Sequence, residues 1–259
     1  MSDAKKYTSK LSGARILIIG GSSGIGYSVA EASLEYGASV IISSSQESRV
    51  NSSIDKLLQT YPSAKDRVSG HACNLSGPTI EGNIKHLFEQ TGKLDHIVFT
   101  AGDALATIPI YEATLEGIQK AGMVRFFAPL LVAKYAPKYL SAGPASSLTL
   151  TTGAVSQKPI AGWSVPAAYG GGLHSMTRNL AVDLAPIRVN LVSPGAIETP
   201  LWDHLTKEQL EGFKALYASK HTTGQMGQPE DVAEAYLFAM KDKNCSGSVI
   251  DSNGGFLLL

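Results

Sequence analysis

Apolar runs and amphipathic stretches alternate along the whole chain. Short runs of Val, Ile, Leu and Thr between turn-forming residues are typical of buried strands, and longer stretches with apolar residues three to four apart are typical of helices. The expected strands are residues 15–19, 39–43, 68–73, 96–100, 147–151, 188–193 and 249–252. The expected helices are residues 25–36, 47–60, 79–90, 115–140, 167–184, 207–219 and 230–240. This alternation predicts an α/β fold, a doubly wound domain whose helices cover both faces of a seven-stranded parallel sheet.

The continuous alternation of strands and helices predicts one domain. Pro129 and Pro137 lie within the expected long helix over 115–140 and mark where it would kink. No linker, internal repeat or low-complexity segment interrupts the alternation of elements. We therefore expect an N-terminal tail over residues 1–10 and a single domain over residues 11–259.

The composition excludes several functions. Lys plus Arg and Asp plus Glu both number 22, so no basic surface for nucleic acid or an anionic membrane is expected. No apolar run approaches the ~20 residues of a membrane span, and the chain start lacks the apolar core of a signal peptide. Two cysteines, Cys73 and Cys245, are too few for a disulfide framework, and the six histidines lack the paired spacing of metal ligands. We therefore expect a cytoplasmic protein without a metal site.

The stretch from Ile16 to Gly26 predicts a buried strand that breaks at Gly20 and continues as a helix near Gly24. Its three glycines suit a tight turn, the approach of backbone to a pyrophosphate, and close packing of the helix on the strand. Free N–H groups at the start of a helix attract phosphate. The expected nucleotide contacts here are Gly20, Ser22, Ser23, Gly24, Ile25 and Gly26.

The spacing Gly-x-x-x-Gly-x-Gly differs from the Gly-x-Gly-x-x-Gly fingerprint and resembles the phosphate loop of the short-chain dehydrogenase/reductase family. Three further stretches resemble that family in the same order, namely residues 100–102, 193–200 and 251–255. The resemblance runs from Ser12 to about Phe256. It implies a Rossmann-type oxidoreductase with a dinucleotide cofactor, a small-molecule substrate, and assembly as a homodimer or homotetramer.

The residues after the second strand predict which cofactor is used. A dinucleotide enzyme holds the adenosine ribose there, with an acidic residue for NAD or a basic one for the 2′-phosphate of NADP. No carboxylate sits at this strand end, whereas three serine hydroxyls and a guanidinium can donate to a phosphate. We therefore expect NADP(H), and the alternative is a solvated turn with a surface arginine. The expected contacts are Ser43, Ser44, Ser45 and Arg49.

The resemblance also implies the remaining cofactor contacts. After the third strand, Asn74 and Leu75 stand where the family's Asp-Leu or Asp-Val pair meets the adenine. After the fourth strand, Ala101 and Gly102 are small enough for the cofactor to lie against the strand ends. After the sixth strand, a Pro-Gly turn resembles the segment that meets the nicotinamide half. The residues implied there are Pro194, Gly195, Ile197 and Thr199.

The family's catalytic Tyr and Lys are missing from the matched positions. The family protonates a ketone oxygen with a Tyr whose pKa is lowered by a Lys four residues later, aided by a Ser and an Asn. Counting back from residues 177–185, which match the helix after that Lys, puts Pro166 at the Tyr position and Gly170 at the Lys position. The glycines over 170–172 weaken a helix and suit close backbone packing or a bulky ligand.

The other catalytic positions also differ. The Ser position falls near Thr152 or Gly153, and the Asn position falls on Arg125. Tyr169 stands only three residues from the expected Tyr position. Because Leu173 follows it four residues later, a shifted alignment provides no Tyr-x-x-x-Lys pair either.

Two functions fit these losses. One is a nucleotide-binding pseudoenzyme or interaction module; the other is hydride addition to an imine or iminium carbon, which develops no oxyanion and needs no tyrosine. Arg125 and Trp163 are then the candidates for stacking a flat substrate, with Thr152, Pro166 and Tyr169 beside them. The alternatives are a surface arginine and a core aromatic. Arg125 would repel a cationic substrate unless an acid offsets its charge. The acids available nearby are Asp103, Glu198 and Asp203.

An NADP-type member that lacks these catalytic residues and carries Arg125 and Trp163 resembles the fungal indole-alkaloid reductases that also act as Diels–Alderases. That resemblance implies reduction of an imine in a bulky aromatic intermediate of alkaloid biosynthesis, with templated cyclisation as a second implied activity. The segment over 160–164 carries no acid beside Trp163, which departs from those enzymes.

Overall fold

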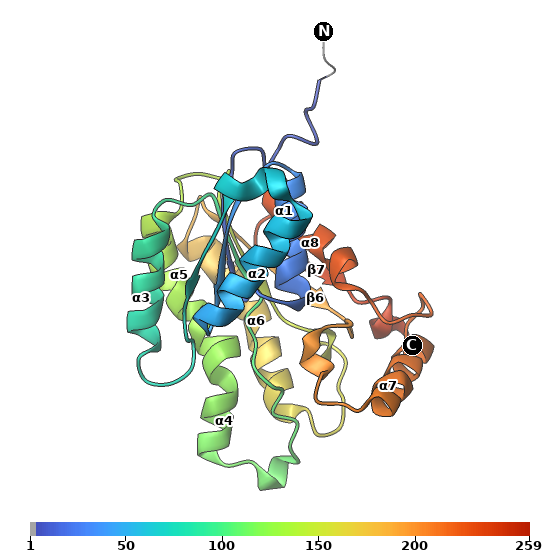
Figure 1. The fold of residues 1–259 in the computed structure, drawn as a ribbon. Coiled ribbons are helices and arrows are strands. Elements are labelled where there is room, and N and C mark those ends of the chain that lie inside the picture. Colours follow the sequence, from blue (N-terminus) through green and yellow to red (C-terminus); the bar gives the residue numbers. More distant parts are fainter. Residues whose placement is uncertain (1–3) are drawn as a thin grey trace.

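Seven parallel strands form one sheet in the order β3-β2-β1-β4-β5-β6-β7 in the computed structural model, which describes residues 4–259 (Figure 1). The strands are β1 Arg15–Ile19, β2 Ser39–Ser44, β3 Val68–Ala72, β4 His96–Phe99, β5 Ser147–Thr151, β6 Arg188–Pro194 and β7 Val249–Ser252. In the centre of the sheet, Ile16 of β1 pairs with Val40 of β2 on one side and with His96 of β4 on the other. The predicted doubly wound α/β fold with a seven-stranded parallel sheet is confirmed.

Helices cover both faces of this sheet. They are α1 Gly24–Glu35, α2 Glu47–Thr60, α3 Ile80–Thr91, α4 Leu115–Gly122, α5 Ala128–Tyr139, α6 Ser164–Asp183, α7 Lys207–Lys220 and α8 Pro229–Lys241. Because successive residues of a strand point to opposite faces, β1 serves two cores. Ile16 and Ile18 pack with α1, α2 and α8, whereas Leu17 and Ile19 pack with α3, α5 and α6.

The long helix expected over 115–140 runs without interruption from Leu115 to Tyr139, and it contains one wider turn just before Pro129. α4 ends at Gly122, and one wider π-helical turn, η3 Met123–Phe127, joins it to α5. A Cβ on Gly122 would lie 2.5 Å from Cζ of Tyr169, so this glycine lets α4 approach α6. Single π-turns inside helices occur frequently at functional sites.

The glycine triplet does not interrupt α6, which begins at Ser164 and runs through it to Asp183. A Cβ on Gly172 would lie 2.7 Å from Cε2 of Phe126 in η3. Close packing therefore explains this glycine, as expected from the sequence. The helix keeps its three glycines because the packed helices offset their low helix propensity.

Short turns of 3₁₀-helix lie between the longer elements and near the end of the chain. The 3₁₀ turns are Pro62–Arg67, Ile110–Glu112, Ala154–Ser156, Pro200–Trp202 (η5) and Phe256–Leu258 (η6). Residues 4–10 are exposed and Leu11 is fully buried; the division between tail and domain stays a prediction. Over residues 4–259, no helix combines the length and the apolar character that crossing a membrane requires.

Candidate cofactor and substrate cavity

A cavity of about 750 Å³ opens at the carboxyl ends of the strands. It is lined from the ends of β1, β2, β3, β4, β5 and β6, and from η3, the start of α6 and the segment between β6 and α8. In open parallel sheets, ligands bind at this edge, where the strand order reverses. Every residue that the sequence predicts to touch a cofactor or a substrate lines this cavity. Their contacts with a ligand stay predictions.

The turn between β1 and α1 forms a cradle of backbone that only glycine permits. Gly20 has a φ of +94°, and a Cβ on it would lie 2.4 Å from the amide nitrogen of Ala101. A Cβ on Gly26 would lie 2.3 Å from the carbonyl oxygen of Gly20, which explains the close packing of α1 on β1. Gly24, at a φ of +52°, opens α1 and packs against Thr199. The free N–H groups of this helix start therefore lie at the cavity, where they can bind phosphate.

The end of β2 lies beside this cradle. The carbonyl oxygen of Ser43 accepts hydrogen bonds from the amides of Gly20 (2.8 Å) and Gly21 (3.2 Å) and so fixes the turn. The hydroxyl of Ser22 donates to that of Ser44 at 2.9 Å. Arg49 lies in the first turn of α2 with an exposed side chain. The set is polar and cationic, as a bound phosphate group requires.

Asn74 and Gly195, two further residues predicted to touch the cofactor, are positioned by neighbouring segments. The side-chain oxygen of Asn74 accepts from the amide (2.9 Å) and hydroxyl (2.7 Å) of Ser76, which orients Asn74 beside Leu75 at the cavity. A Cβ on Gly195 would lie 2.9 Å from the carbonyl oxygen of Asn253. The Pro-Gly turn after β6 is therefore packed against the segment that follows β7.

Arg125 lies in η3 and reaches the end of β4. A Cβ on Gly102 would lie 2.7 Å from three guanidinium atoms of Arg125, so the missing side chain leaves the space that the guanidinium fills. Nε of Arg125 lies 3.2 Å from Oδ1 of Asp103, and Nη2 donates to the carbonyl oxygen of Asp103. Burial lowers the pKa of Arg125, and the Asp103 carboxylate opposes this effect. Arg125 is therefore a paired cation in the cavity and not a surface arginine.

The positions of the missing catalytic residues lie together at the cavity. The hydroxyl of Thr152, after β5, donates to the carbonyl oxygen of Gly170 at 2.9 Å. Pro166 lies in the first turn of α6. Tyr169 lines the cavity, but its hydroxyl donates to the carbonyl oxygen of Ile118 in α4 at 2.9 Å. Within residues 4–259, no lysine lines the cavity, and no three His, Cys, Asp or Glu side chains gather as a metal site.

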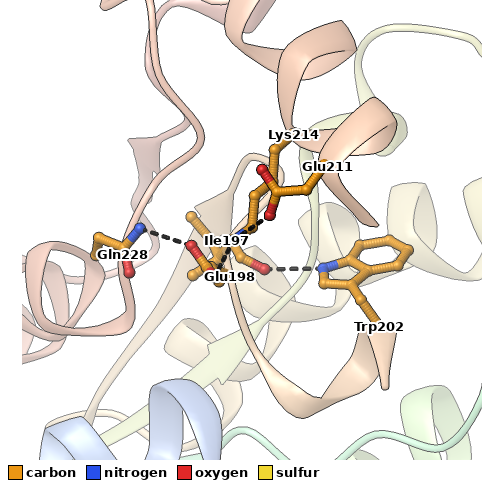
Figure 2. A network of polar contacts seen from close by, with 6 residues as sticks. All are labelled: Ile197, Glu198, Trp202, Glu211, Lys214 and Gln228. Atoms are coloured by element: carbon orange, nitrogen blue, oxygen red, sulfur yellow. Dashed lines mark hydrogen bonds and ion pairs between the residues drawn. The ribbon is translucent and has the colours of Figure 1, made fainter. Parts of the chain in front are cut away.

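The turn that follows β6 is attached to α7 by the polar network of Figure 2. Oε1 of Glu198 lies 2.5 Å from Nζ of Lys214, and Oε2 accepts from Gln228 at 3.2 Å. Glu211 adds a second carboxylate 3.5 Å from Lys214. These contacts lower the pKa of Glu198 and raise that of Lys214. Of the acids considered near Arg125, Glu198 thus pairs elsewhere and Asp103 makes the contact.

Of the aromatic residues that line the cavity, Trp163 was predicted individually, whereas Trp202, Tyr217 and Phe256 were not. Trp163 precedes α6 and is half-buried, as expected of a cavity residue more than of a core one. Trp202 in η5 donates from its indole nitrogen to the carbonyl oxygen of Ile197 at 2.8 Å (Figure 2). Tyr217 of α7 and Phe256 of η6 also line the cavity. No motif in the sequence singles out the rings of Trp202, Tyr217 and Phe256.

Comparison with known families identifies the family to which this chain belongs. A family model of SDR-like Rossmann domains matches residues 7–259. This chain belongs to the short-chain dehydrogenase/reductase family. Its curated relatives include the short-chain dehydrogenase/reductase fsr5 of Gibberella fujikuroi, which is 46% identical over the full length of both chains.

Solved structures of other short-chain dehydrogenase/reductases superpose on nearly the whole chain. The MalC reductase/Diels-Alderase from Malbranchea aurantiaca matches with a TM-score of 0.90 and 42% identity, covering 97% of this chain and 99% of MalC. A small-chain dehydrogenase in complex with NADPH matches with a TM-score of 0.77 and 27% identity, covering 96% of this chain and all of the other. The predicted membership of the family and the resemblance to a reductase/Diels–Alderase are therefore confirmed.

Proposed function

We propose that this protein is an NADPH-dependent reductase that adds hydride to the imine or iminium carbon of a bulky aromatic compound. The observation that carries the proposal is the contrast within one cavity. Its phosphate end has the glycine cradle and the serine-arginine set of a dinucleotide site, whereas its other end offers Arg125, Asp103 and no lysine beside a tyrosine.

The residues present fit NADPH. The cradle that a Cβ on Gly20 or Gly26 would fill leaves room for a pyrophosphate against the start of α1. Ser44 and Arg49 offer donors for a 2′-phosphate. The solved relative that contains NADPH supports the same assignment. Bound NADPH would supply a hydride, with its electron pair, to an electrophilic carbon.

The reaction end fits a cationic acceptor. When hydride adds to the carbon of an iminium ion, the C=N π electrons move to nitrogen and neutralise it, so no oxyanion needs a proton. Positioning of donor and acceptor is then the main contribution, worth up to ~10 kcal/mol in well-oriented cases. The Asp103 carboxylate offsets the charge of Arg125, which lets a cation enter. Kinship with a reductase/Diels-Alderase supports the same chemistry and extends the proposal to templated cyclisation.

A matched pair of substrates tests the proposal. Oxidation of NADPH is followed with 3,4-dihydroisoquinoline, a bicyclic imine, and with 1-tetralone, a ketone of similar shape. We expect consumption of NADPH with the imine and none with the ketone. Reduction of the ketone would show that a proton donor exists in the cavity and would contradict the proposal. Binding of NADPH with turnover of neither would favour the pseudoenzyme.

A further inference from the structure

Four aromatic rings from two distant segments lie next to one another, and three of them line the cavity. The ring centroids of Trp202 and Phe213 are 4.4 Å apart, those of Phe213 and Tyr217 are 4.5 Å apart, and those of Tyr217 and Phe256 are 5.9 Å apart. Trp202, Tyr217 and Phe256 line the cavity. We call these four residues the aromatic wall. Such a continuous apolar surface binds flat rings by burial and stacking.

Lys158 connects this wall to the other side of the cavity. It belongs to the loop between β5 and α6, which also carries Thr152 and Trp163. Its ammonium donates to the carbonyl oxygen of Phe256 at 2.8 Å and to that of Leu259. The same ammonium lies 4.4 Å from the centroid of the Phe256 ring, within the range of a cation–π contact. Lys158 therefore fixes both the backbone and the ring of Phe256.

Two further hydrogen bonds hold the segment that leads into η6 and its first residue. The amide of Phe256 donates to the carbonyl oxygen of Asn253 at 3.0 Å, and Thr222 donates to that of Gly254 at 3.1 Å. The ring of Phe256 also packs against those of Tyr217 and His221, with centroids 5.9 and 5.7 Å away, and Lys158 joins η6 to the loop between β5 and α6. Without the Lys158 ammonium, Phe256 could move away from that loop, and the wall would lose its last ring.

We propose that Lys158 is a positioning residue that holds Phe256 in the aromatic wall, and that the wall selects flat, fused-ring cations as substrates. The inference rests on the proposed function and names its substrate class. The faces of Trp and Tyr rings are electron-rich, so they attract a cationic ring as well as burying it. A small monocyclic imine would reach the reaction end without covering the wall.

Binding to the NADP⁺-loaded protein tests the proposal without turnover, because NADP⁺ has no hydride to give. Dissociation constants are measured by calorimetry for 3,4-dihydro-β-carboline, a fused-ring imine, and for 2-methyl-1-pyrroline, a monocyclic one. We expect Lys158→Met to weaken binding of the fused-ring imine roughly tenfold and that of the monocyclic imine less than about twofold. Lys158→Arg should restore binding, since a guanidinium also donates to two carbonyl oxygens. Lys220→Met, at an exposed position of α7, is the control.

A double-mutant cycle separates positioning from a general loss of structure. If Lys158 acts through Phe256, the effects of Lys158→Met and Phe256→Leu on fused-ring binding should not add. Additive effects, or equal losses for both imines, would overturn the proposal. If Lys158→Met does not fold, Trp202→Leu takes its place and must weaken fused-ring binding selectively. Tight, wall-dependent binding without NADPH consumption would refute the proposed reductase while leaving the wall intact.

Discussion

A missing Cβ and a paired charge define the reaction end of the cavity. Gly102 leaves the space in which the guanidinium of Arg125 lies, and Asp103 balances its charge from the next position along the chain. The side chains of Arg125 and Asp103 are 29% and 40% exposed, so water screens the pair only in part. At this scale, one glycine leaves the room in which the Arg125–Asp103 pair forms.

The choice of cofactor can be tested at Arg49. Replacing Arg49 with Ala should weaken NADPH binding by about 1.5–3 kcal/mol, the scale of a charge-assisted hydrogen bond, and leave NADH binding unchanged. Dissociation constants from fluorescence titration of both cofactors provide the measurement. Lys56→Ala, on the exposed side of the same helix, is the matched control. Equal affinity of the unaltered protein for the two cofactors would contradict the assignment.

Tyr169 offers a test of the missing acid. Its hydroxyl donates to the carbonyl oxygen of Ile118, and no lysine within residues 4–259 lines the cavity to stabilise a phenolate. Tyr169→Phe should therefore keep the rate of imine reduction and lower the free energy of unfolding by about 1 kcal/mol through the lost hydrogen bond. Tyr111→Phe removes a hydroxyl from an exposed side chain and should change neither quantity. A Tyr169→Phe protein that binds both ligands without turnover would restore tyrosine as the acid.

At the scale of elements, α7 is attached to the cavity by side chains of the segment after β6. Phe213 of α7 packs against Trp202 of η5, and Lys214 of α7 pairs with Glu198 in the turn after β6 (Figure 2). A capping box at Thr206 fixes its start. Because Ile197 and Thr199 lie on the same turn as Glu198, the ion pair couples the position of α7 to the predicted nicotinamide contacts.

The Glu198–Lys214 pair should make this coupling depend on pH. Since Lys214 lowers the pKa of Glu198, the stabilisation is complete above the ordinary pKa of a glutamate and is lost as the pH falls through the lowered value. The protection factors of the α7 amides, which correct the exchange rate for its intrinsic pH dependence, should therefore stay high from neutral pH down to the ordinary glutamate range and fall as the pH drops through the lowered pKa of Glu198. In Glu198→Gln they should be low throughout. Glu208→Gln, an exposed change in the first turn of α7, is the control; equal exchange in both variants would argue against the coupling.

The elements and the phosphate end were predictable from sequence because their signals are local. The apolar run of β1 and the glycines after it carry their own geometry, and the strand ends of a parallel sheet converge on one edge. The π-helical turn at Arg125 was not predictable, because the contacts of Gly122 with Tyr169 and of Gly172 with Phe126 join segments far apart in the chain. The aromatic wall was missed for the same reason: its rings meet only after α7 and η6 have folded over the cavity.

At the scale of the whole molecule, single apolar side chains of η3, α5 and α6 are exposed. Phe127, Leu130 and Val182 are 36%, 40% and 76% exposed. Apolar residues gathered on a surface typically mark an interface with another chain. The homo-oligomer that the family resemblance implies stays a prediction, and these exposed residues are the positions at which to test it.

Sedimentation velocity tests the assembly. We expect the protein to sediment as a homodimer or a homotetramer. Val182→Glu would place a charge in an apolar contact and should shift the protein toward the monomer. Leu216→Glu, an equally drastic change at an exposed site of α7 away from these helices, should leave the assembly intact. A monomer for the unaltered protein would refute the expectation.

The walls of the cavity come from residues in or directly after six of the seven strands and from segments as far apart as Ile19 and Phe256. The site therefore exists only when the whole chain has folded, and an unfolded chain offers a ligand nothing to bind. A ligand that binds this cavity therefore stabilises the folded protein by mass action. A ligand present at 100 times its dissociation constant adds about 2.7 kcal/mol to the free energy of unfolding. Supply of cofactor in the cell would thus regulate how much of this protein survives, as well as how fast it works.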